Sequence, residues 1–126
     1  MANELRLPLK TKWFLLTKSE IKTEDYREIN MYWFKRLVFQ PKKCIEYLGL
    51  KNDHDILMAF KDNFWSSTIA FNLFETNVMT LGYPSNDNIS HILKFEHVGI
   101  EVRTGNPEWG AEPNKLYFVI KHGKKH

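Results

Sequence analysis

IKTEDYREI, residues 21–29, places charged side chains on both faces of a segment that otherwise has the composition of a strand. Side chains alternate between the two faces of a strand. One face therefore carries Thr23, Asp25 and Arg27. The other carries Glu24, Tyr26 and Glu28. A half-buried strand normally alternates polar residues with valine, isoleucine or leucine, so charge on both faces indicates that one face lines a polar cleft. The alternative is a solvated edge strand whose charges oppose aggregation.

The order Lys22-x-x-Asp25-x-Arg27, after the apolar and basic segment KWFLLTK (residues 12–18), resembles the signature of the ASCH domain. A second block, EWGAEP (residues 108–113) and then YFVI (residues 117–120), resembles the end of the ASCH-like proteins of gut bacteria and their phages. The resemblance covers residues 5–38 and 76–122. Two positions differ from the family pattern: Glu20 stands where the family usually has glycine, and Asp25 where many members have glutamate or threonine.

This resemblance implies an α+β fold built on a small PUA-like β-barrel of about five to six strands with flanking helices. Residues 40–75 then form a helical insertion. The length of 126 residues and the hydrophobic content of 43% suit one compact core and are too small for two domains. We therefore expect a single ASCH/PUA-like domain over residues 1–126.

Composition restricts the possible partners. A net charge of +3 falls short of the dense positive charge of proteins that hold duplex DNA by phosphate contacts. No segment approaches the ~20 apolar residues of a membrane helix, so we expect no membrane partner and a cytoplasmic location. One cysteine, Cys44, excludes an internal disulfide and a CxxC metal site. We expect no metal and no cofactor, and the oligomeric state stays open.

The apolar patterns predict mixed secondary structure. Strands are expected at residues 4–9, 23–29, 76–81, 89–102 and 115–122. Helices are expected at residues 10–19, 31–38 and 41–49, and from residue 53 or 55 through Phe71. Asn30 is the expected N-cap of the second helix, and the proline in the first strand indicates a sheet edge. We interpret residues 123–126 as a frayed tail, and His91 and His97 as structural rather than metal-ligating.

Aromatic side chains beside an arginine and a lysine are typical of sites that stack a base and hold a phosphate. Lys22 and Arg27 are the expected donors, and Asp25 would orient them. The full set of expected ligand-binding residues is Lys22, Thr23, Asp25, Arg27, Tyr32, Trp33, Tyr83, Glu108 and Trp109. The expected partner is single-stranded RNA, an unpaired base or a modified nucleotide.

Two other functions remain open. One branch of the ASCH-like proteins resembles N4-acetylcytidine amidohydrolases, which implies catalytic roles for Lys22 and Asp25, with Glu108 or Glu96 as a further carboxylate. Other relatives look like weak, metal-independent ribonucleases. The third class is a protein-interaction module that uses residues 40–75, and a contiguous exposed apolar patch there would favour it.

Overall fold

The structure is a computed structural model that describes residues 3–82 and 91–126. Its strands are β1 (Glu4–Leu9), β2 (Glu24–Arg27), β3 (Thr76–Leu81), β4 (Ile92–Thr104) and β5 (Leu116–Lys125). Its α-helices are α1 (Thr11–Lys18), α2 (Met31–Leu37), α3 (Pro41–Leu48) and α4 (Asp53–Lys61). Short 3-10 helices follow at η1 (Trp65–Ser67) and η3 (Pro107–Trp109). The predicted α+β class is confirmed.

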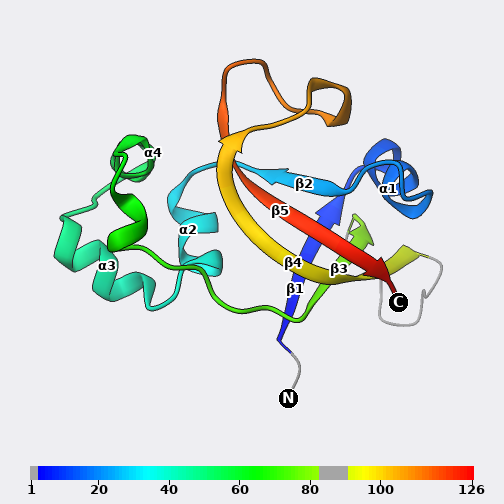
Figure 1. The fold of residues 1–126 in the computed structure, drawn as a ribbon, viewed down its shortest axis with the longest axis horizontal. Coiled ribbons are helices and arrows are strands. Elements are labelled where there is room, and N and C mark those ends of the chain that lie inside the picture. Colours follow the sequence, from blue (N-terminus) through cyan, green and yellow to red (C-terminus); the bar gives the residue numbers. More distant parts are fainter. Residues whose placement is uncertain (1–2, 83–90) are drawn as a thin grey trace.

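The strands form one mixed sheet in the order β1-β3-β4-β5-β2, in which only β1 and β3 run parallel. The sheet curves strongly through the long β4 (Figure 1). It does not close, because no backbone pairing joins β1 to β2 in the described residues. The expectation of a closed barrel is therefore wrong. Pro8 contributes to this outcome, since proline has no N–H to donate to a neighbouring strand.

One apolar core fills the concave side of the sheet. The alternation predicted for the first strand is confirmed, with Leu5, Leu7 and Leu9 buried. Helices α2, α3 and α4 gather at one end of the sheet, and α1 lies at the other (Figure 1). Phe34 of α2 and Phe118 of β5 are fully buried in this core.

The helix boundaries follow the capping signals closely. The Asn30 side chain accepts a hydrogen bond from the Trp33 backbone N–H at 2.9 Å, as predicted. Helix α3 begins at Pro41 and ends before Gly49, whose φ of 65° is the left-handed conformation expected at a helix C-terminus. Asn52, rather than Asp53 or Asp55, caps α4.

The last predicted helix is too long. Helix α4 ends at Lys61, because the chain turns at Asp62, whose carboxylate accepts the Phe64 backbone N–H at 3.0 Å. Phe71 lies in an extended segment that bridges to Val38. Its ring nevertheless stacks on that of Phe60, with centroids 6.3 Å apart, so Phe60 lies in the core and the partly buried Phe71 packs against it. Phe64 is 76% exposed and does not.

The C-terminal residues are paired rather than frayed, contrary to expectation. Strand β5 runs to Lys125, and the His126 backbone N–H donates to the Lys94 carbonyl at 2.9 Å. The Lys125 ammonium donates to the Lys18 carbonyl at 3.0 Å. The long β4 supplies a ladder partner for this segment that local sequence does not reveal.

The turn between α1 and Lys22 places Glu20 in a backbone conformation that favours glycine. Glu20 has a φ of 65°, the left-handed conformation that glycine adopts without steric cost. The Ile21 and Lys22 backbone N–H groups both donate to the Leu16 carbonyl at 3.1 Å, which closes the helix end. A side chain at this position is strained, because its Cβ approaches the following carbonyl.

We predict that Glu20→Gly raises the free energy of unfolding by about 0.5–1 kcal/mol, because the relief of left-handed strain exceeds the entropy that glycine adds to the unfolded chain. Urea denaturation measures the change. Glu20→Ala keeps the Cβ and is the matched control, with no gain expected. A glycine variant no more stable than the alanine variant would contradict the prediction.

Candidate functional site

The two faces of β2 have separate roles. On the outer face, the Tyr26 hydroxyl donates to Glu24 at 2.6 Å, and the Arg103 guanidinium contacts the same carboxylate at 2.6 Å. Burial and the bond to Glu24 raise the pKa of Tyr26. The Tyr26 hydroxyl also accepts the Asn106 backbone N–H at 2.8 Å. This face therefore fixes the loop after β4 and does not form a cleft.

On the inner face, Asp25 is held between two cations. One carboxylate oxygen lies 3.2 Å from the Lys22 ammonium, and the other accepts from Arg27 Nε at 2.6 Å. The Lys22 ammonium also donates to the Glu24 carbonyl at 2.7 Å. Lys22 is 2% exposed and Asp25 is 4% exposed. Both charges are thus buried, so neither a solvated edge strand nor a cleft wall describes them.

The pKa of Asp25 shows which effect dominates in this cluster. Burial by itself would raise the pKa, since it disfavours the charged form. The charges of Arg27 and Lys22, with the hydrogen bond from Arg27, outweigh burial and hold the pKa of Asp25 below its usual value. The carboxylate therefore stays ionised, and it fixes the position of Arg27.

Arg27 is the member of this cluster that reaches a surface hollow. Its Nη2 donates to the Pro8 carbonyl at 2.7 Å, so the side chain spans the gap between the edge strands β1 and β2. The hollow has a volume of about 650 Å³. Its lining residues are Pro8, Leu9, Lys10, Thr11, Arg27, Leu81 and Gly82. We call it the Arg27 hollow. No carboxylate belongs to this lining, and Nη1 of Arg27 donates to no group in the described part of the chain.

Aromatic rings extend from Arg27 toward the surface. The Arg27 guanidinium lies 4.9 Å from the centre of the Trp33 ring, and Arg36 lies 5.3 Å from the same ring. The Tyr32 ring meets Trp33 edge-on at 5.2 Å. Trp33 is 9% exposed and Tyr32 is 60% exposed, so Tyr32 has the more accessible ring and Trp33 supports Arg27.

A second polar network crosses the inner face of the sheet. The fully buried Asn77 donates from Nδ2 to the Lys121 carbonyl at 3.2 Å, and this bond fixes the orientation of its amide. Nδ2 also contacts His122 Nδ1 at 2.7 Å, and Oδ1 contacts His97 Nδ1 at 2.7 Å. The Asn77 amide therefore makes His97 Nδ1 a donor and His122 Nδ1 an acceptor. Burial lowers the pKa of His97 and lowers that of His122 to about 4, so both rings are neutral at pH 7.

The structure brings only part of the predicted site together. Lys22, Asp25, Arg27, Trp33 and Tyr32 form one connected set. The Thr23 side chain is exposed. Its backbone carbonyl accepts a hydrogen bond from the His122 backbone N–H at 3.0 Å. Tyr83 lies outside the described residues.

The loop after β4 lies apart from the Arg27 hollow. A Cβ at Gly105 would lie 2.7 Å from the Tyr26 ring, and one at Gly110 would lie 2.8 Å from the Trp13 ring, so the loop packs closely on both. Trp109 is half-buried in this loop, and Glu108 is exposed. Neither residue lines the hollow.

Sequence reasoning missed Pro8, Lys10, Asn77 and His122. Lys10 stands directly before α1, at its N-cap position. His122 is in alternation with the buried Ile120 and Phe118 along β5, which was a usable signal that it faces inward. Asn77 gave no signal, because its role depends on two strands that follow it in the chain.

Neither a family model, a curated protein nor a solved structure matches the chain. Within residues 3–82 and 91–126, no three histidine, cysteine, aspartate or glutamate side chains are grouped so as to hold a metal ion. In the same residues, no helix has both the length and the apolar character needed to cross a membrane.

We predict that Lys22→Met lowers the free energy of unfolding by about 3–5 kcal/mol, because it leaves part of the buried Asp25 charge uncompensated. The effect is expected on the fold itself because Lys22 is buried. Urea denaturation measures the effect. Lys18→Met, at an exposed position, should change stability by less than about 0.5 kcal/mol. Equal midpoints for the two variants would refute the role of Lys22.

We predict that the free energy of unfolding falls as the pH drops from about 6.5 to about 4, because His122 gains a proton in the unfolded chain before it does so in the folded protein. The loss due to His122 is on the order of 3 kcal/mol. Below the folded pKa both states are protonated and this loss ends. Chemical denaturation across the pH range measures it. His122→Gln should flatten the slope, whereas His54→Gln, at an exposed position, should preserve it. A parent protein equally stable at pH 7 and pH 4.5 would exclude buried neutral histidines.

Proposed function

We propose that this protein binds a nucleotide or single-stranded nucleic acid in the Arg27 hollow. The observation that carries the proposal is that Arg27 faces this hollow while Asp25, the Pro8 carbonyl and the Trp33 ring hold its guanidinium in place. A guanidinium held in this way loses little side-chain entropy when it binds, and its planar donors match a phosphate or a base edge.

The size and charge of the hollow support the same ligand class. A volume of about 650 Å³ lies within the range of small-molecule sites, about 300–1,000 Å³. Lys10 adds a second cation, and the lining residues that the structure describes include no carboxylate. Lys10 also stands at the start of α1, where the first backbone N–H groups have no partner within the helix. Lys10, the lack of carboxylates in the described lining and the N–H groups at the start of α1 each favour an anion as the ligand.

Tyr32 supplies the stacking surface. Its ring is exposed, and Trp33 and Arg36 support it from beneath. Base stacking on an aromatic ring contributes about 1–3 kcal/mol per base and accepts any sequence. A single-stranded nucleic acid could place a phosphate at Arg27 and stack a neighbouring base on Tyr32. The roles first assigned to Trp33 and Lys22 change, because both are buried: they position Arg27 rather than touch the ligand.

We further propose that the chain is related to the ASCH domain, with its barrel left open between β1 and β2. Support comes from the Lys22-x-x-Asp25-x-Arg27 pattern and from Glu20, which stands where the family usually has glycine and adopts a left-handed conformation that favours glycine. The hydrolase alternative gains no such support. The Lys22 ammonium is buried by two internal contacts, and the carboxylate candidates Glu96 and Glu108 are both exposed.

We predict that Tyr32→Ala weakens binding of a fluorescein-labelled single-stranded RNA of about ten nucleotides by about 1–3 kcal/mol, with little loss of stability. Fluorescence anisotropy at low salt measures the affinity. Lys10→Gln should also weaken binding and should reduce its salt dependence by about one unit of slope, because one phosphate contact is lost.

Tyr47→Ala is the matched control, because Tyr47 is 81% exposed but lies on α3, away from the Arg27 hollow. It should bind RNA as the parent does. The proposal fails if Tyr32→Ala and Lys10→Gln both bind RNA and mononucleotides as the parent does. Binding of mononucleotides alone would restrict the ligand to free nucleotides.

A further inference from the structure

Residues 39–73 expose large apolar side chains that the Arg27 hollow does not explain. Phe39 is 55% exposed, Tyr47 81% and Leu73 88%. Helix α3 contains no fully buried residue, although Cys44 and Ile45 pack partly against the core. An apolar surface of this kind on a monomer usually marks a site for a partner.

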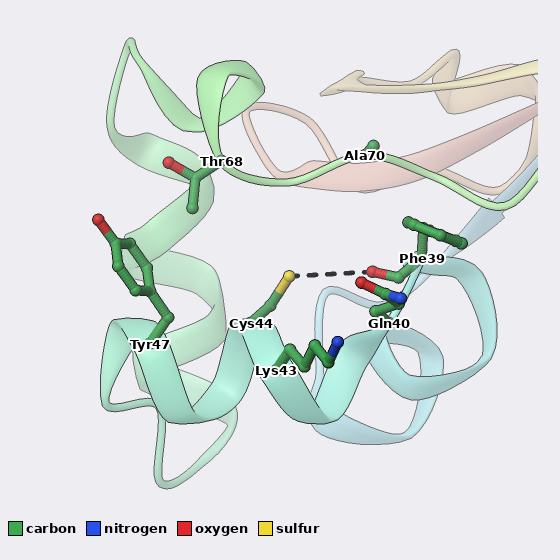
Figure 2. A pocket seen from close by; sticks show the side chains of 7 residues that line it. All are labelled: Phe39, Gln40, Lys43, Cys44, Tyr47, Thr68 and Ala70. Atoms are coloured by element: carbon green, nitrogen blue, oxygen red, sulfur yellow. Dashed lines mark hydrogen bonds between the residues drawn. The ribbon is translucent and has the colours of Figure 1, made fainter.

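These side chains border a continuous groove. One part, of about 320 Å³, lies between α3 and residues 68–70. A second part, of about 500 Å³, continues over residues 70–73 to Asn3. The two parts share Phe39 and Ala70, and we call them together the α3 groove. Figure 2 shows the Cys44 sulfur pointing into the first part, with Tyr47 and Thr68 at one end and Phe39 and Ala70 at the other.

The floor of the α3 groove is fixed by backbone hydrogen bonds. The Phe39 N–H donates to the Ala70 carbonyl at 2.8 Å, and the Asn72 N–H donates to the Leu37 carbonyl at 2.8 Å. Between them, Val38 pairs with Phe71, and both side chains belong to the core. A groove built on this bridge is preformed, so a partner would not bear the cost of ordering it.

The charge around the α3 groove selects one kind of occupant. Lys43 is the one charged residue in the described lining. Residues 35–48 contain four cations, Lys35, Arg36, Lys42 and Lys43, against the single carboxylate of Glu46, and all five are exposed. The charged group in this lining is thus a cation, within a segment of four cations and one carboxylate, and positive charge beside an apolar floor attracts a partner with apolar side chains flanked by carboxylates.

We infer that the α3 groove docks an acidic amphipathic segment of a partner protein, with one large apolar side chain in each part and a carboxylate beside Lys43. A short segment laid in an apolar groove is a recurrent mode of peptide recognition. This inference is independent of nucleic-acid binding, because the α3 groove and the Arg27 hollow share no lining residue.

Cys44 provides a local readout, because it is the only cysteine of the chain and lines the groove. The probes are synthetic peptides of about twelve residues, helical and extended, with leucines spaced to one face and glutamates elsewhere. Each has a matched peptide with lysine in place of glutamate. We expect the acidic peptides to slow the reaction of Cys44 with a thiol reagent at least about fivefold, and the basic peptides to leave it unchanged.

Two variants test the geometry. Ala70 is exposed where both parts of the groove meet, so the ring of Ala70→Phe should fill the groove and weaken binding of the acidic peptide about tenfold. Thermal melting should show that this variant keeps its fold. Lys43→Glu should weaken binding of the acidic peptide about fivefold, whereas Lys51→Glu, at a position outside the lining, should leave this binding unchanged.

Four results would overturn the inference. Equal protection of Cys44 by acidic and basic peptides would show that charge does not select the partner. No protection by any peptide at millimolar concentration would show that the α3 groove does not bind such segments. Protection by single-stranded RNA in place of peptide would reassign the groove to nucleic acid. Protection that rises with the concentration of the protein alone would identify a second copy of the chain as the occupant.

Discussion

The carboxylate of Asp25 lies inside the protein, and much of the surrounding arrangement follows from keeping it there ionised. An isolated buried carboxylate would be far too costly, so it needs cations with good geometry. Lys22 reaches it from the turn after α1, and Arg27 reaches it from the same strand. Each cation has a further fixed acceptor, a backbone carbonyl of Glu24 or Pro8. The ion cluster therefore ties together α1, β1 and β2.

The same cluster accounts for how an open sheet stays curled. Strands β1 and β2 are edges without a backbone ladder between them, and the bond from Arg27 to the Pro8 carbonyl spans that gap. Elsewhere on the inner face of the sheet, Asn77 of β3 reaches past the irregular register of β4 to the Lys121 carbonyl of β5. Side-chain hydrogen bonds thus replace backbone pairing at the two places where curvature interrupts it.

The two candidate surfaces differ in how they are built. The Arg27 hollow combines two cations with apolar lining residues and depends on the buried ion cluster, so its shape is coupled to the stability of the fold. The α3 groove is apolar and rests on the bridge between Val38 and Phe71, at the end of the sheet where α2, α3 and α4 gather (Figure 1). Ligands at the two sites would meet different elements of the chain, so the sites can be tested separately.

The sequence by itself determined most of the local structure. Alternation predicted β1 and the two faces of β2, and the caps at Asn30 and Gly49 predicted where α2 begins and α3 ends, because these signals act within a few residues. The resemblance of residues 22–27 to the ASCH signature also indicated Lys22, Asp25 and Arg27 as a unit. Only the tertiary structure decided that this unit is buried, that Arg27 alone reaches a hollow, and that Trp109 lies elsewhere. It also decided that the sheet stays open and that β5 extends to Lys125. Burial and strand partners depend on residues far apart in the chain, such as Pro8 with Arg27 and Asn77 with Lys121, and no local pattern encodes those contacts.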